Sequence, residues 1–187
     1  MPPRPSGPRL RDLDVERFAR GVQHATYHHL TMRAFDLGIE IPPIGERSSL
    51  WLSAHQLALY ALTGRGTEDA GGPMEYVQSV AEALYTRAGD AGTYDVPDLD
   101  EDADPRTWPG LVIRAALARE RVMRGIEMIS RADLAVLGSL DERQVRRLID
   151  EGEIVGDNRA GVHPDHARQW LAVRGVEGFA RSQGGAR

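Results

Sequence analysis

Residues 129–171 read ISRADLAVLGSLDERQVRRLIDEGEIVGDNRAGVHPDHARQWL, and their caps and apolar positions decide the expected fold. Ser130 opens an S-x-x-D capping box with Asp133, which predicts a short helix beginning there. Gly138 is expected to take the left-handed conformation that ends this helix. Asp141 is predicted to cap a second helix, and a glutamine three residues later completes its capping box. The stretch therefore predicts two short helices joined by a tight turn.

The second half of the stretch predicts a small hairpin and a third helix. Gly152 stops the second helix, and residues 153–162 place apolar residues on both sides of a polar GDNRAG turn, which predicts a two-stranded wing. Pro164 stands near the first position of the third helix, where proline is well tolerated. Trp170 and Leu171 are expected to fold back over the small core of this segment.

This order of parts resembles the winged helix-turn-helix of the excisionase and mercury-resistance-regulator type, over roughly a quarter of the chain. The residues that carry the resemblance are Leu134, Ala135, Leu140, Asp141, Val145, Arg147, Leu148, Ile149, Gly152, Asp165, Trp170 and Leu171. The spacing from the small residue Ala135 to Val145 matches that family. The family usually has its turn glycine at the position of Ser139, whereas glycine here comes one residue earlier. The resemblance implies DNA binding.

Five side chains are candidates for contacts with DNA. Residues early in the second helix of such a module face base edges, so Arg143 is expected to contact guanine. Gln144 is expected to contact adenine unless its side chain is held in the capping box. Arg146, Arg147 and the wing-tip Arg159 are expected to contact phosphates. For each of these three arginines the alternative is a solvated surface side chain.

The charge of this segment leaves two functions open. Residues 129–171 contain six Arg and eight Asp or Glu, a balance of −2, whereas a phosphate-binding surface is normally positive. Clustering of the arginines favours a locally positive field. We therefore predict sequence-specific DNA binding, by a transcriptional regulator or a recombination accessory factor. The alternative is a protein-interaction adaptor that keeps the winged fold without binding DNA.

The helix expected before this segment is unusually basic. Residues 106–124 contain five Arg and one Glu, and they lead directly into the segment described above. Two roles are open for this helix. It is a rigid connector that sets the position of the DNA-binding segment, or it contacts the DNA backbone through Arg114 and Arg121, which share a face.

The whole chain of 187 residues is predicted to be mostly α-helical, with a helical N-terminal bundle and a C-terminal winged helix-turn-helix that includes a small β-hairpin. The expected parts are a flexible tail (1–9), a helical domain (10–89), an acidic linker (90–107), a connecting helix (108–128), the winged helix-turn-helix (129–175) and a flexible tail (176–187). Within the helical domain, Ser53 and Gln56 are expected to form a capping box. The expected partners are double-stranded DNA and a second copy, bound through the N-terminal helices, because useful specificity normally needs two reading modules.

Several functions are excluded or unsupported by the sequence. The chain has no Cys, which excludes disulfides, thiolate zinc sites and cysteine nucleophiles. His24, His28 and His29 form one cluster, but no third-ligand motif accompanies them, so no metal is expected. A nucleophile elbow and a phosphate loop are absent, so neither a cofactor nor enzymatic activity is expected. No apolar run approaches the length of a membrane span, and we expect a soluble cytoplasmic protein without a membrane partner.

Overall fold

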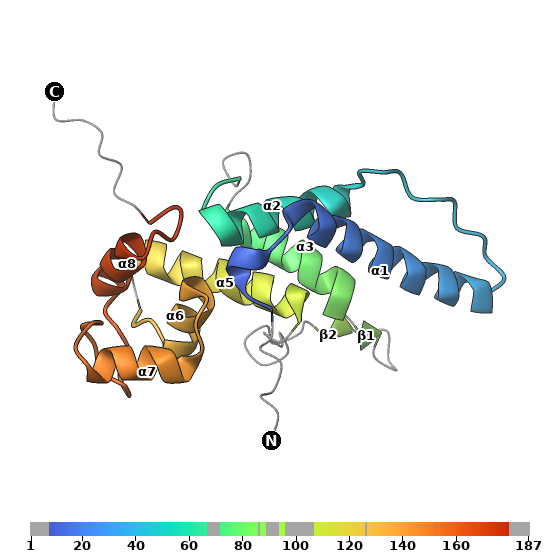
Figure 1. Cartoon of the computed structure of the whole chain (residues 1–187). Helices are drawn as coiled ribbons and strands as arrows, with labels where there is room; N and C mark the ends of the chain where they lie inside the picture. Colours follow the sequence, from blue (N-terminus) through green and yellow to red (C-terminus); the bar gives the residue numbers. More distant parts are fainter. Residues whose placement is uncertain are drawn as a thin grey trace, which may run out of the picture.

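The computed structural model describes residues 8–66, 72–85, 87–88, 94–95, 107–125 and 127–179. These residues form a mostly α-helical fold (Figure 1), which confirms the predicted class. The helical elements are η1 (Leu10–Asp12), α1 (Val15–Asp36), α2 (Ser49–Thr63), α3 (Pro73–Tyr85), α5 (Trp108–Arg124), α6 (Arg131–Gly138), α7 (Glu142–Asp150) and α8 (Pro164–Val173). Two short strands, β1 (Arg87–Ala88) and β2 (Tyr94–Asp95), pair antiparallel, with Arg87 opposite Asp95. Among the described residues, no helix has the length and apolar character needed to cross a bilayer.

The first two long helices begin where polar side chains cap them. Asp14 accepts a hydrogen bond from the backbone N–H of Arg17 at 3.0 Å and starts α1. Ser48, rather than the predicted Ser53, caps α2 and accepts from the N–H of Trp51 at 3.1 Å. The reason is a tertiary contact, because the buried Gln23 of α1 accepts from the Ser48 hydroxyl at 2.7 Å. The start of α2 is therefore bound to the middle of α1.

Helix α5 forms the centre of the molecule. Thr107 caps it by accepting from the N–H of Gly110 at 3.3 Å, and Pro109 occupies its first turn. One side of α5 contacts α2 and α3, and the other side contacts α6 and α8 (Figure 1). The buried apolar side chains form one continuous cluster from Leu10 to Phe179. The helices on both sides of α5 are therefore parts of the same hydrophobic core.

Arg119 of α5 is the largest fully buried side chain among the described residues. Its guanidinium donates to the carbonyl oxygens of Ala61 (3.2 and 3.3 Å), Leu62 (3.0 Å) and Glu177 (2.9 Å). The ring of Phe179 lies 4.5 Å from its central carbon. Since the last carbonyls of a helix have no partner within it, Arg119 caps the end of α2. Burial lowers the pKa of Arg119 to about 10, which leaves the side chain charged at neutral pH.

The residues after α8 pack against the core at their beginning. The sequence predicts a flexible tail from residue 176, but Phe179 is only 3% exposed. The N–H of Val176 donates to the carbonyl of Leu171 at 3.0 Å. Ordered packing therefore continues to Phe179, because its ring and the Glu177 carbonyl are bound by Arg119. The remainder of that predicted tail, most of the tail at 1–9 and most of the linker at 90–107 lie outside the described residues.

Candidate nucleic-acid interface

Helix α6 begins at the predicted N-cap residue, Ser130. The Ser130 hydroxyl accepts from the N–H of Asp133 at 3.1 Å. The Asp133 carboxylate also forms an ion pair with Arg121 of α5 at 3.3 Å. Leu134 and Leu137 are buried beneath α6. The ion pair directs Arg121 toward α6, so it supports the connector role of α5 rather than a contact between this side chain and DNA.

The turn after α6 differs from the expected one. Ser139, and not Gly138, takes the left-handed conformation, with a φ of 52°. Gly138 is the last helical residue, and a Cβ placed on it would lie 2.9 Å from Cη2 of Trp170. Glycine is needed at 138 because the indole packs directly against the backbone there. The left-handed position at Ser139 is the one where the family named above usually has glycine.

Helix α7 begins with the predicted capping box. The Asp141 carboxylate accepts from the N–H of Gln144 at 2.8 Å, and Oε1 of Gln144 accepts from the N–H of Asp141 at 3.0 Å. Of the two roles open to Gln144, contact with adenine or capping of α7, the side chain has the capping role in this structure. Its carbonyl oxygen is occupied, so a contact between Gln144 and adenine through both amide atoms would require the box to open.

The two faces of α7 have opposite character. Val145, Leu148 and Ile149 are buried and fix the helix against the core. The opposite face carries the three exposed arginines Arg143, Arg146 and Arg147. An amphipathic helix this short is held by its buried face and caps. The arginines therefore project from a fixed element (Figure 1, orange helix).

Two of these arginines have acidic neighbours on the same helix face. Arg146 lies 3.9 Å from Asp150, and Arg147 lies 3.6 Å from Glu151. All four side chains are at least half exposed, and such pairs contribute little to stability. Arg143 has no ion pair or side-chain hydrogen bond with any residue in the described ranges. It is the α7 arginine whose donors are most available to a ligand.

The wing contains isolated bridges in place of the predicted two-stranded sheet. Ile129 pairs with Val162, with N–H to carbonyl distances of 2.8 and 2.9 Å, and Asp157 pairs with Gly161. The expected strand at Ile154 does not form in this described segment. The N–H of Ile154 instead donates to the carbonyl of Leu148 at 3.1 Å, just after the end of α7. Its buried side chain then continues the core.

Arg159 stands at the tip of the wing, on a turn organised by Asp157. The Asp157 carboxylate accepts from the N–H groups of Ala160 and Arg159, both at 2.7 Å. These hydrogen bonds, the one from Ala160 first, hold the pKa of Asp157 below its usual range. The turn fixes the backbone of Arg159 and leaves its exposed side chain directed into solvent.

Acid is expected to loosen this turn. Because the folded pKa of Asp157 is lowered, its stabilising contribution is present above the unfolded pKa of about 4 and is lost as pH falls through the folded pKa. Hydrogen exchange of the Arg159 and Ala160 amides, followed by NMR, should therefore quicken relative to the rest of the wing below about pH 4. Asp157→Asn keeps the acceptor oxygen without titrating, so an equal acid response in that variant would contradict the prediction.

Arg168, the arginine of α8, has a structural role. Arg168 of α8 donates through Nη2 to the carbonyls of Val122 (3.0 Å) and Met123 (3.2 Å) at the end of α5. Trp170 and Leu171 are buried, as expected. Arg168 and Arg119 are important residues that sequence reasoning misses, because both bind carbonyl groups of helices distant in the sequence.

The histidines of α1 do not form a metal centre in the described part of the chain. His24, His28 and His29 are exposed. Across the described ranges, no three His, Asp or Glu side chains are grouped so that they could hold a metal ion. His24 lines a cavity together with Arg20 and Trp51. Nothing in this geometry supplies a nucleophile with an adjacent general base.

Comparisons with protein-family models, with curated proteins and with solved structures found no match to this chain. The function is therefore inferred from the residues and their geometry.

Proposed function

We propose that this protein binds double-stranded DNA sequence-specifically, as a transcriptional regulator or a recombination accessory factor. In this proposal, α6 and α7 form a helix-turn-helix and residues 153–162 form its wing. The observation that carries it is α7 itself, which is capped at Asp141, anchored by a buried apolar face and exposes three arginines on the other. A preorganised helix with basic side chains on its outer face suits the major groove.

The side chains have different roles in this proposal. Arg143 stands in the first turn of α7, where a guanidinium reaches the O6 and N7 atoms of guanine. Arg146, Arg147 and Arg159 contact phosphates and set the orientation of the module. Gln144 stays in its capping box and supports the start of the helix. Contacts with phosphate require Arg146 and Arg147 to leave their weak pairs with Asp150 and Glu151.

The test is selection of DNA from a random-duplex library by the full chain at low and moderate salt. One enriched motif is expected, with affinity that falls steeply as salt rises. Arg143→Ala should relax the preference at one base position and cost about 1–3 kcal/mol of binding free energy. Arg147→Ala should weaken binding to all sequences and reduce the slope of log affinity against log salt concentration by about 1. Arg168→Ala is unsuitable as a control because Arg168 caps α5.

A protein-interaction adaptor is the second candidate function. The observation that favours it is the pairing of Arg146 and Arg147 with acids on the same face, within a segment whose formal charge is −2. An adaptor should bind no duplex even at low salt, and Arg143→Ala should change nothing in the selection. Enrichment of a motif by the unaltered chain would reject this candidate.

A further inference from the structure

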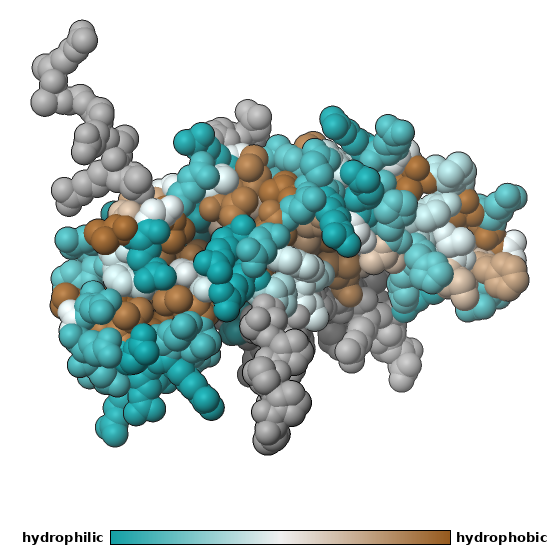
Figure 2. Space-filling view, viewed as in Figure 1, coloured by the Kyte–Doolittle hydropathy of each residue, from teal (hydrophilic) through white to brown (hydrophobic). Residues whose placement is uncertain are grey.

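The second half of α1 lacks the packing that helices of this length normally have. From His24 to Asp36 the single buried residue of this fully described stretch is Ala34. Figure 1 shows this half projecting beyond α2, α3 and α5, and Figure 2 shows apolar colour on that end of the molecule. Met32 is 53% exposed and Phe35 is 78% exposed. Most helical stability in proteins comes from the packing of an apolar face, and the apolar side chains of this half have no such packing among the described residues.

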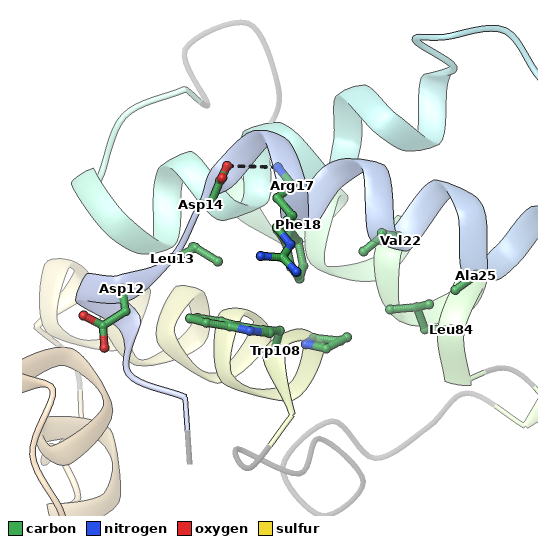
Figure 3. Close-up of a pocket in the computed structure, with 11 residues that line it drawn as sticks. Asp12, Leu13, Asp14, Arg17, Phe18, Val22, Ala25, Leu84 and Trp108 are labelled. Carbon is green, nitrogen blue, oxygen red and sulfur yellow. Dashed lines mark hydrogen bonds between the residues drawn. The ribbon is translucent and has the colours of Figure 1, made fainter. Parts of the chain in front are cut away.

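The first half of α1 borders a cavity of about 420 Å³. Figure 3 shows Phe18, Val22 and Ala25 on its α1 side, with Trp108 of α5 and Leu84 of α3 also lining it. Gly21 lies between Phe18 and Ala25 along the cavity. A Cβ placed on Gly21 would meet nothing within 4 Å. The cavity has apolar walls from these three helices, with Asp12, Asp14 and Arg17 also in its lining, and the absence of a side chain at Gly21 leaves space within it.

Several α1 residues that line the cavity share one stripe of the helix with the exposed apolar residues of its second half. Its members, spaced alternately by three and four residues, are Phe18, Gly21, Ala25, His28, Met32 and Phe35. This is the spacing by which two helices pack along a common seam. Beside the cavity the stripe has the small residues Gly21 and Ala25 after Phe18, and the projecting half has the large residues Met32 and Phe35.

This stripe is complementary to itself when a second copy runs antiparallel. With His28 at the two-fold axis, Phe35 and Gly21 each lie seven residues from the axis, about 10.5 Å along the helix. Phe35 of each copy then faces Gly21 of the other, and Met32 lies within about 1.5 Å of the level of Ala25 along the helix axis. Large side chains meet small ones at these two positions, and a two-fold interface uses the same patch on both copies.

We propose that two copies of this chain pair through antiparallel α1 helices, with Phe35 of each copy seated in the cavity beside Gly21 and Trp108 of the other. The occupant of the exposed stripe is thus a second copy of this chain. The proposal does not rest on DNA binding, because self-association is measured without DNA. A dimer would also supply the two reading modules that specific DNA recognition normally uses.

The first test is a dilution series of the full chain by sedimentation and light scattering. A dimer is expected, and Phe35→Gln should raise its dissociation constant at least tenfold, because the aromatic anchor seated in the cavity is lost. Gly21→Gln should do the same by filling the recess. That variant keeps the monomer folded, since Gln has a higher helix propensity than Gly and the site is open. Leu37→Gln is the matched control, because Leu37 is 74% exposed but lies off the stripe.

The second test determines the register of the two α1 helices by disulfide cross-linking. The chain has no Cys, so each introduced cysteine is the single one in its variant. His28→Cys should form an intermolecular disulfide at the axis. Phe35→Cys alone should not, since its two copies lie about 21 Å apart, but it should cross-link to Gly21→Cys in a mixture. A protein that stays monomeric, or one in which Phe35→Cys cross-links with itself, would overturn the proposal.

Discussion

Replacing Arg119 with alanine is expected to lower the free energy of unfolding by about 3–5 kcal/mol. The substitution leaves the carbonyls of Ala61, Leu62 and Glu177 without their donor and creates a cavity under the Phe179 ring. Thermal unfolding followed by circular dichroism should show a fall in Tm of roughly 6–20 °C for a chain of this size. The loss should affect the whole chain, because Arg119 joins the end of α2 to the residues after α8.

Two variants separate the causes of this loss. Arg119→Met fills most of the cavity but still removes the hydrogen bonds, so it should cost less than Arg119→Ala and remain clearly destabilised. Arg124→Met is the matched control in the same helix, because Arg124 is 60% exposed and its one ion pair within the described part of the chain is with Glu120. It should cost less than about 1 kcal/mol. Equal stability of Arg119→Ala and Arg124→Met would show that the buried guanidinium does not stabilise the fold.

Gly161→Ala is expected to destabilise the protein by about 2–4 kcal/mol and to displace the wing. Gly161 has a φ of 95°, and a Cβ at this position would lie 2.8 Å from the carbonyl oxygen of Ile129. That oxygen accepts the N–H of Val162 in the bridge that closes the wing. An alanine therefore combines backbone strain with a clash against backbone that cannot move away freely.

Gly152→Ala is the control for this prediction. Gly152 also has a positive φ, 76°, but nothing lies within 4 Å of a Cβ placed there. Its substitution should cost only about 1 kcal/mol, from the left-handed conformation alone. Denaturant unfolding of the two variants measures the difference. If Gly161→Ala and Gly152→Ala are equally stable, the contact with Ile129 does not restrict the wing.

Capping residues with local partners are predictable from the sequence, whereas choices made by tertiary contacts are not. Ser130 and Asp141 both cap helices with partners three residues away. Ser48 is preferred over Ser53 because Gln23, from a different helix, binds its hydroxyl. The difference between Gly138 and Ser139 depends on the packing of Trp170, which a local glycine rule does not include.

The candidate site also has one part that local sequence predicts and one part that tertiary contacts decide. The exposed positions of Arg143, Arg146 and Arg147 follow from the 3.6-residue period of α7 and its three buried apolar residues. The wing is less predictable, because Ile154 completes the end of α7 instead of joining a strand. Arg119 cannot be distinguished from Arg114 or Arg121 by any local pattern, since its acceptors are the ends of two distant segments.

The continuous core around α5 has a consequence for how this protein unfolds. Because α5 packs against α2 on one side and α6 on the other, neither half retains a complete hydrophobic core when the other unfolds. The chain should behave as a single cooperative unit, and α7 should lose its structure when the N-terminal helices lose theirs. The segment that carries the arginines of α7 should therefore not fold by itself when it is transferred to another protein. Its availability to any ligand is coupled to the stability of the whole chain.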